Sequence, residues 1–200
     1  AGGSREDFIL ARFNADGSAI DGSEFRVNTD LSRAHYDASV SMNASGQFAV
    51  MWDNGIGVQM RRYDSSGAVS GGQTSVTSES SAGNGSIALA DDGGAVVVWR
   101  ETQVGRAVMM QRFSSAGVTI GGPTLVNSTF SSDQANPSIA IDGSGNFIVA
   151  WEGNGTGDNS GVFAQKYNAN GSRVGGEFRL NLTTSSDQNK VSLAILDLDN

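Results

Sequence analysis

The stretch Pro137-Ser-Ile-Ala-Ile-Asp-Gly-Ser-Gly-Asn-Phe-Ile-Val-Ala-Trp151 indicates two β-strands joined by a tight turn. Its first five residues alternate in character, and Asp142–Gly145 is a cluster of turn residues. The run from Asn146 to Trp151 is apolar, has the length of a strand and is bounded by a glycine. The stretch therefore predicts a β-hairpin whose second strand is buried on both faces.

Two further strands complete a unit of about 50 residues. Val162–Tyr167 is predicted as a third strand, and Gly175–Asn181 leads into a short fourth strand after the turn Asn168–Gly171. The segment Glu152–Gly161 is rich in glycine and asparagine and is predicted as a loop. No part of the unit carries an apolar stripe of helical period.

The same unit recurs along the chain. A cationic residue followed by an aromatic residue ends each third strand, in steps of 50, 50 and 54 residues: Arg12-Phe13, Arg62-Tyr63, Arg112-Phe113 and Lys166-Tyr167. A glycine follows each aromatic residue four positions later: Gly17, Gly67, Gly117 and Gly171. The second-strand phrase recurs as well: Gly46–Trp52, Gly93–Trp99 and Gly145–Trp151. A fixed period of this length is typical of repeat architectures.

Four short antiparallel strands per repeat predict an all-β fold, a β-propeller-like array of four-stranded blades. In such an array each blade packs face to face on the next, and the second strand is held between neighbouring blades. A β-solenoid fits less well because its coils are usually shorter. Tandem β-sandwiches also fit less well, because one unit is too small to form a sandwich alone.

We interpret the 200 residues as a single repeat domain with incomplete ends. Its predicted parts are a partial blade at 1–34, blades at 35–82, 83–132 and 133–184, and the first strand of a further blade at 185–200. Two interpretations of these ends remain open. The chain is either a piece of a longer array or a protomer that polymerises head to tail by strand addition.

Composition excludes several classes of function. The formal net charge is −8, from 13 Lys and Arg against 21 Asp and Glu, which opposes binding to nucleic acid and to anionic membranes. No stretch approaches the ~20 apolar residues of a membrane span, and no signal peptide is visible. The absence of cysteine excludes disulfides and cysteine-based metal or redox sites.

Two columns of equivalent residues are predicted to anchor the repeat. The tryptophans are expected to pack between blades, although they could instead be stacking platforms for sugars: Trp52, Trp99 and Trp151. The cationic column is expected to donate hydrogen bonds to a neighbouring turn, and its alternative role is to line a ligand groove: Arg12, Arg62, Arg112 and Lys166.

Residues for catalysis or metal binding are sparse. His35 is the only histidine, and we expect a solvated or capping side chain. Asp197 and Asp199 are candidate calcium ligands, because the terminal segment resembles the beginning of an Asp-x-Asp-x-Asp-Gly loop. Glu24 and Glu177 occupy equivalent positions without forming a recognisable pair of catalytic acids. The chain is therefore predicted not to be an enzyme and to need no cofactor, with calcium as the one candidate ion.

The phrases Gly145–Trp151, Val162–Tyr167 and Gly175–Asn181, together with Asp187-Gln188, resemble a repeat of very large secreted bacterial proteins. Many of those proteins carry calcium-binding RTX nonapeptides elsewhere and leave the cell through type I secretion. The resemblance covers nearly the whole chain and implies an extracellular, cell-surface location. The RTX nonapeptide itself is absent here, so no calcium ligand is implied by the resemblance.

These observations predict a non-enzymatic extracellular module that serves in adhesion, in a filament or in a biofilm matrix. Its expected partners are other copies of itself or neighbouring repeats of a longer chain. A carbohydrate-binding, lectin-like propeller is the alternative, with glycans as partners. A third possibility is a propeller enzyme whose catalytic residues lie outside this sequence.

Overall fold

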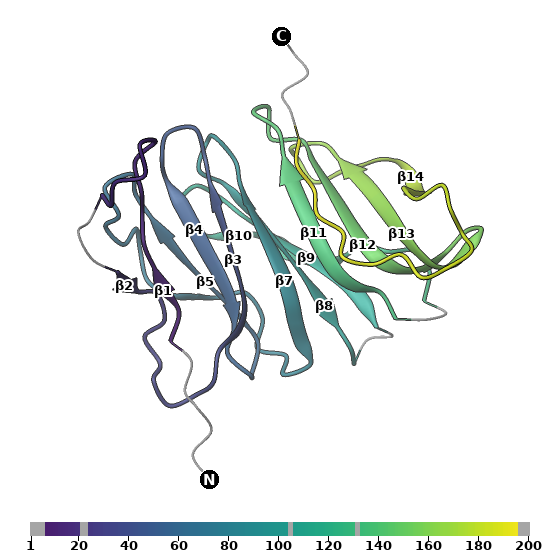
Figure 1. Ribbon diagram of the computed structural model, residues 1–200, viewed down its shortest axis with the longest axis horizontal. Coiled ribbons are helices and arrows are strands. Elements are labelled where there is room, and N and C mark those ends of the chain that lie inside the picture. The colour runs from purple at the N-terminus through teal and green to yellow at the C-terminus, as the bar shows by residue number, and fades with distance from the viewer. Residues whose placement is uncertain (1–6, 21–23, 104–105, 131–132, 196–200) are drawn as a thin grey trace.

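The computed structural model describes residues 7–20, 24–103, 106–130 and 133–195. They form an all-β architecture of three four-stranded antiparallel sheets and one two-stranded antiparallel sheet. The predicted fold class is confirmed, and the sheets do not close into a ring (Figure 1). Among these residues there is no helix that is long and apolar enough to cross a membrane.

The sheets follow one another along the chain and stack side by side (Figure 1). The N-terminal sheet contains β1 (Ile9–Leu10) and β2 (Phe25–Arg26). Sheet I contains β3 (Tyr36–Met42), β4 (Phe48–Asp53), β5 (Val58–Tyr63) and β6 (Thr74–Ser75). Sheet II contains β7 (Ala82–Leu89), β8 (Ala95–Glu101), β9 (Ala107–Phe113) and β10 (Thr119–Leu125). Sheet III contains β11 (Ala135–Ile141), β12 (Phe147–Gly155), β13 (Asp158–Tyr167) and β14 (Arg173–Arg179).

The first strands of successive sheets lie next to one another, and serine hydroxyl groups join β3 to β7 and β11 to residues 191–195. Ser39 Oγ of β3 accepts a hydrogen bond from the amide of Ile87 in β7 at 3.4 Å. Ser138 Oγ of β11 accepts one from the amide of Leu193 at 3.1 Å. Residues 191–195 therefore continue the column of first strands, although they are not assigned to a strand themselves.

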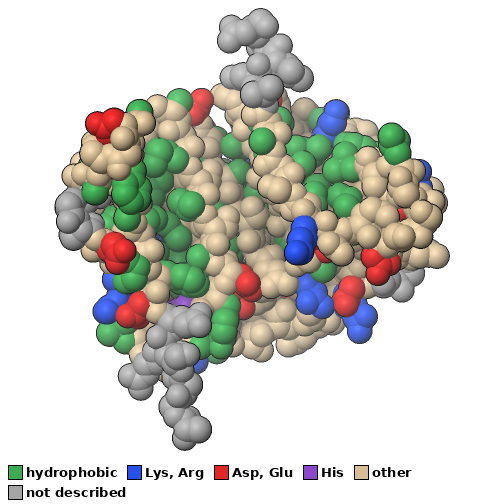
Figure 2. Space-filling view, viewed as in Figure 1, with side chains coloured by type: hydrophobic (Ala, Val, Ile, Leu, Met, Phe, Trp, Pro, Cys, Tyr) green, Lys and Arg blue, Asp and Glu red, His purple; other side chains and the backbone are tan. Residues whose placement is uncertain are grey.

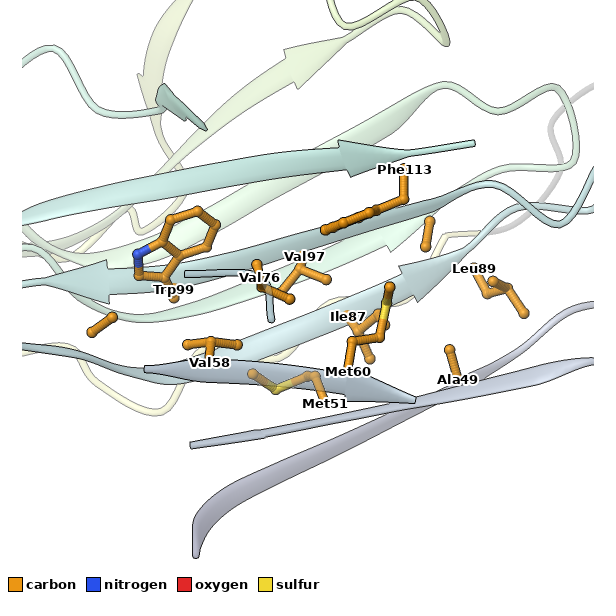
Figure 3. Packing of buried hydrophobic residues seen from close by; sticks show 12 residues of the cluster. Ala49, Met51, Val58, Met60, Val76, Ile87, Leu89, Val97, Trp99 and Phe113 are labelled. Atoms are coloured by element: carbon orange, nitrogen blue, oxygen red, sulfur yellow. The ribbon is translucent and has the colours of Figure 1, made fainter. Parts of the chain in front are cut away.

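Hydrophobic cores fill the spaces between the sheets. Side chains alternate across a strand, so neighbouring residues of β8 enter different cores. Trp99 and Val97 face sheet I, where they meet Met51 and Met60 (Figure 3). Val98 faces sheet III instead. This arrangement explains why the second strands are apolar without alternation, since both of their faces are buried.

The three arginines of the cationic column dock their sheets onto a turn of the next sheet. Arg12 donates hydrogen bonds to the Ser65 and Ser66 carbonyls at 2.9 and 2.5 Å. A Cβ atom at Gly67 would lie 2.6 Å from Arg12 Nη2, and the φ angle of Gly67 is +88°. Arg62 and Arg112 make the equivalent contacts with the following two sheets. Gly67, Gly117 and Gly171 thus leave room for the guanidinium group of the preceding sheet and adopt a left-handed turn conformation.

The predicted loop at Glu152–Gly161 is wrong for most of its length. Strand β12 continues to Gly155 and β13 begins at Asp158, with Gly153 opposite Gly161 in the ladder. Backbone pairing does not require large side chains. At Gly155 a Cβ atom would lie 2.3 Å from the Phe163 ring, so the glycine accommodates that ring within a strand.

Candidate functional site

Four residues with a left-handed backbone occupy equivalent positions, each two residues before the serine of a first-strand phrase. They are Asp37 (φ 52°), Asn84 (φ 47°), Asn136 (φ 48°) and Lys190 (φ 64°). In sheets I, II and III this position coincides with a register shift between the first and second strands. Asn and Asp tolerate this conformation better than most residues, and such local strain is concentrated at functional sites.

Three of these residues line a depression at the beginning of the first strands, which we call the mouth. Its volume is about 320 Å³, and it is lined by Asp37, Asn84 and Asn136 and by the smaller residues Ala38, Gly85, Pro137 and Val191. Asn84 Nδ2 donates a hydrogen bond to Asn136 Oδ1 at 3.3 Å, and the Asn84 amide donates one to Asp37 Oδ2 at 3.3 Å. The mouth thus brings exposed polar groups from three sheets together.

Carboxylates from the ends of second strands lie beside the mouth. Glu152 Oε2 accepts a hydrogen bond from Asn136 Nδ2 at 2.7 Å, and Glu152 Oε1 accepts one from the Val191 amide at 3.3 Å. Asp53 occupies the equivalent position in sheet I. Burial raises the pKa of Asp53, and the charge of Asp37 raises it further, while the Gly55 amide and His35 act in the opposite direction.

Asp53→Asn is expected to stabilise the chain at pH 7. The pKa of Asp53 in the folded state lies above its ordinary value of 3.8, so the unfolded chain ionises first as the pH rises. Stability is therefore lost as the pH rises through the folded pKa, and asparagine removes that loss. Urea denaturation at pH 7 and pH 3 should show the gain only at pH 7. An equal effect at both values would contradict this electrostatic origin.

The structure places the tryptophans away from solvent. Trp52, Trp99 and Trp151 are buried between sheets, so their rings are not sugar-stacking platforms. Trp151 Nε1 donates a hydrogen bond to Gln134 Oε1 at 2.8 Å. Tyr36, which precedes Asp37 in the sequence, is half exposed. Sequence reasoning missed Tyr36, although its neighbour Asp37 aligns with Asn84 across the repeats.

The other predicted site residues lie elsewhere. Lys166, the last member of the cationic column, has its ammonium group 5.8 Å from the centre of the Phe178 ring. His35 is buried and not solvated. Its Nε2 lies 2.7 Å from the carbonyl of Asp30, in the connection that enters sheet I. Asp197 and Asp199 fall outside the described residues. Within the described ranges, no three acidic, histidine or cysteine residues are grouped to hold a metal ion.

The fold is similar to solved propeller structures. The Dos1 propeller matches with a TM-score of 0.50 and 12% identity, over 88% of this chain and 42% of that one. A glycoside hydrolase matches with a TM-score of 0.50 and 11% identity, over 80% of this chain and 37% of that one. Prolyl oligopeptidase B from Galerina marginata matches at 0.49 and 14%, over 89% of this chain and 24% of that one. No protein-family model and no curated sequence matches the chain.

The chain therefore spans less than half the length of these proteins, and the similarity shows the propeller-type fold alone. The sequence-based prediction that the chain is not an enzyme is wrong, because it was inferred from the repeat architecture. A glycoside hydrolase shares this architecture, so a column of structural repeats does not exclude catalysis. Function has to be argued from the site itself.

Proposed function

We propose that the chain binds carbohydrate at the mouth. The observation that carries the proposal is the ring of equivalent left-handed residues, which presents Asp37, Asn84 and Asn136 around one depression. Carboxylate and carboxamide groups both pair with hydroxyl groups, and asparagine can donate and accept at once. Tyr36, which adjoins Asp37 in the sequence and is half exposed, is the aromatic side chain that the proposal assigns to the sugar.

The charge of the mouth favours a neutral sugar. Asp37, Asp53 and Glu152 are carboxylates at or beside the mouth, and Lys190 is the cationic residue of the left-handed ring. An acidic sugar would be repelled by the carboxylates, and the whole chain carries a formal net charge of −8. Neutral oligosaccharides with several adjacent hydroxyl groups therefore fit best.

Replacing Asn84 or Asn136 by alanine is expected to weaken binding of a neutral oligosaccharide about tenfold, which corresponds to one hydrogen bond of roughly 1.4 kcal/mol. A glycan array identifies the oligosaccharide, and isothermal titration measures the affinities. Asn159→Ala, an exposed substitution away from the mouth, is the matched control and should bind like the parent chain. Unchanged affinity in both mouth variants would refute the proposal, as would an array without any bound neutral glycan.

The proposal places this binding outside the cell. Its support is the resemblance of the repeat phrases to those of large secreted bacterial proteins. Glycans of a cell surface or an extracellular matrix would then be the ligands, and the adhesive role follows from that binding. Antibody labelling of intact cells that express the parent protein tests the location, and labelling only after permeabilisation would contradict it.

A further inference from the structure

The β3 part of one face of sheet I is uncovered in the part of the chain that the structure describes, while the β4 and β5 part is packed against the N-terminal sheet. Val40 and Met42 of β3 are 58% and 59% exposed, whereas the equivalent residues Ile87 and Leu89 of β7 are 4% and 3% exposed. Phe13, which follows β1, is 62% exposed, whereas its equivalents are 2% exposed: Tyr63, Phe113 and Tyr167. We call the surface formed by Val40 and Met42 the open face, and Phe13 lies on the side of the N-terminal sheet that faces away from sheet I. It is distinct from the mouth.

Strand register shows which interface the open face belongs to. Val40 lies opposite Val50 and Met42 opposite Phe48. Cross-strand partners share a face of the sheet, and Val50 and Phe48 pack towards the N-terminal sheet. The open face therefore belongs to the interface between the N-terminal sheet and sheet I. Figure 2 shows hydrophobic side chains gathered on the flank where Figure 1 places β1 and β4.

The other interfaces show what such a face requires. Ile87 and Leu89 are packed in one cluster with Ala49 and Met51, which come from the second strand of the preceding sheet. The ring of Tyr63 stacks on Phe48, a second-strand residue of its own sheet, at 4.6 Å between centroids. The N-terminal sheet contains only strands equivalent to a third and a fourth strand. Side chains of a second strand are therefore the element that the open face requires.

We infer that the open face receives a β-hairpin of the repeat's own type, made of a first strand, a turn and a second strand. The second strand pairs with β1, as β4 pairs with β5 and β8 with β9. Its inward side chains cover Val40 and Met42, and its phenylalanine-type position lies beside Phe13. The serine of the first strand accepts the amide hydrogen of Val40, as Ser39 accepts that of Ile87.

A second copy of the chain fits this face less well. The first-strand phrase Val191–Ile195 lies against β11, and the described residues beyond sheet III supply no second strand. A single first strand would leave β1 without its neighbour and Phe13 without a stacking partner. The hairpin supplies the neighbour of β1 and a residue opposite Phe13. Its sequence is of the type found at residues 84–100, where Val96 and Val98 face the following sheet and Ala95 lies opposite Phe113.

A synthetic peptide of residues 84–100 added to the full chain tests the inference. The peptide is expected to shift the methyl NMR signal of Met42 and to raise the melting temperature by about 5 °C at saturation. The peptide with Val98→Asp should not bind, because that residue faces β3. The peptide with Val97→Asp should bind, because that residue faces away. In the chain, Met42→Asp should abolish binding and the exposed control Val118→Asp should not.

A hairpin fused to the chain tests the inference if the free peptide aggregates. Residues 84–106 are placed ahead of Asp7, so that the natural connection of sheet II leads into the third-strand position at Phe8. The fusion should melt at a higher temperature than the parent chain, and Val98→Asp within the added segment should remove the gain. If neither the free nor the fused hairpin changes the melting temperature or the Met42 signal, the inference is wrong. Self-association without peptide that is lost in Met42→Asp and on deletion of 191–195 would overturn it in favour of a second copy.

Discussion

Replacing Trp99 by alanine is expected to lower the free energy of unfolding by about 3–5 kcal/mol. Trp99 is buried between sheets I and II, where it belongs to the same cluster as Met51, Val58 and Met60 (Figure 3). Alanine would leave a cavity that two stacked sheets cannot close without breaking other contacts. Urea denaturation followed by circular dichroism measures the loss. It is a large part of the 5–15 kcal/mol that usually stabilises a domain.

Phenylalanine substitutions separate packing from hydrogen bonding. Trp151→Phe removes the bond from Trp151 Nε1 to Gln134 Oε1, while Trp99 Nε1 has no hydrogen-bond partner among the described residues. Trp151→Phe is therefore expected to cost about 1–2 kcal/mol more than Trp99→Phe. Equal losses for the two phenylalanine variants, or a loss below about 1 kcal/mol for Trp99→Ala, would contradict this description of the cores.

Replacing Arg62 by methionine is expected to cost about 2–3 kcal/mol of unfolding free energy. The Arg62 guanidinium donates hydrogen bonds to the Ser114 carbonyl at 3.2 Å, to the Ser115 carbonyl at 2.7 Å and to the Gly93 carbonyl. Methionine preserves the apolar stem but leaves these carbonyls of sheet II without their donor. Thermal and urea denaturation of the purified variant measure the loss.

Lys166→Met is the matched control for the arginine substitution. Lys166 ends the same column, but its side chain is exposed and lies over a ring, not over a turn of a following sheet. Its replacement should change stability by no more than about 0.5 kcal/mol. If Arg62→Met and Lys166→Met have the same effect, the docking of arginine onto the next turn does not stabilise the stack.

Much of the fold could be predicted because local patterns and the global architecture agree. The apolar run that ends at Trp151 predicts a strand buried on both faces, and β12 lies between such faces. The recurrence of the cationic residue in each repeat reflects a contact between sheets, since Arg62 donates a hydrogen bond to the turn that precedes Gly117. Period and residue type were sufficient for these elements because each interface repeats the same geometry.

The candidate site could not be predicted in the same way. Asp37, Asn84 and Asn136 are about 50 residues apart and meet only because the first strands of three sheets lie side by side. The sequence of a single turn does not indicate that residues so far apart in the chain come together. The available signal was the alignment of these residues two positions before Ser39, Ser86 and Ser138, where Asp or Asn recurs.

Two errors share a physical cause. The Glu152–Gly161 segment was predicted as a loop and His35 as a solvated or capping side chain. Both predictions relied on composition, whereas strand pairing extends the hairpin and packing buries His35. Glycine and asparagine extend the β12–β13 hairpin, and the inter-sheet connection covers the imidazole. The prediction that the chain is not an enzyme has a related cause, since a repeated scaffold does not determine which polar side chains lie at the ends of its strands.

The most direct test of a carbohydrate site at the mouth is an NMR titration of the ¹⁵N-labelled chain with a neutral oligosaccharide. The side-chain amide signals of Asn84 and Asn136 are predicted to shift together, with the backbone amide of Asp37, and to follow one binding curve. If a bound oligosaccharide leaves these signals in place and shifts residues of the turns near Gly67 and Gly117 instead, the mouth is not the site.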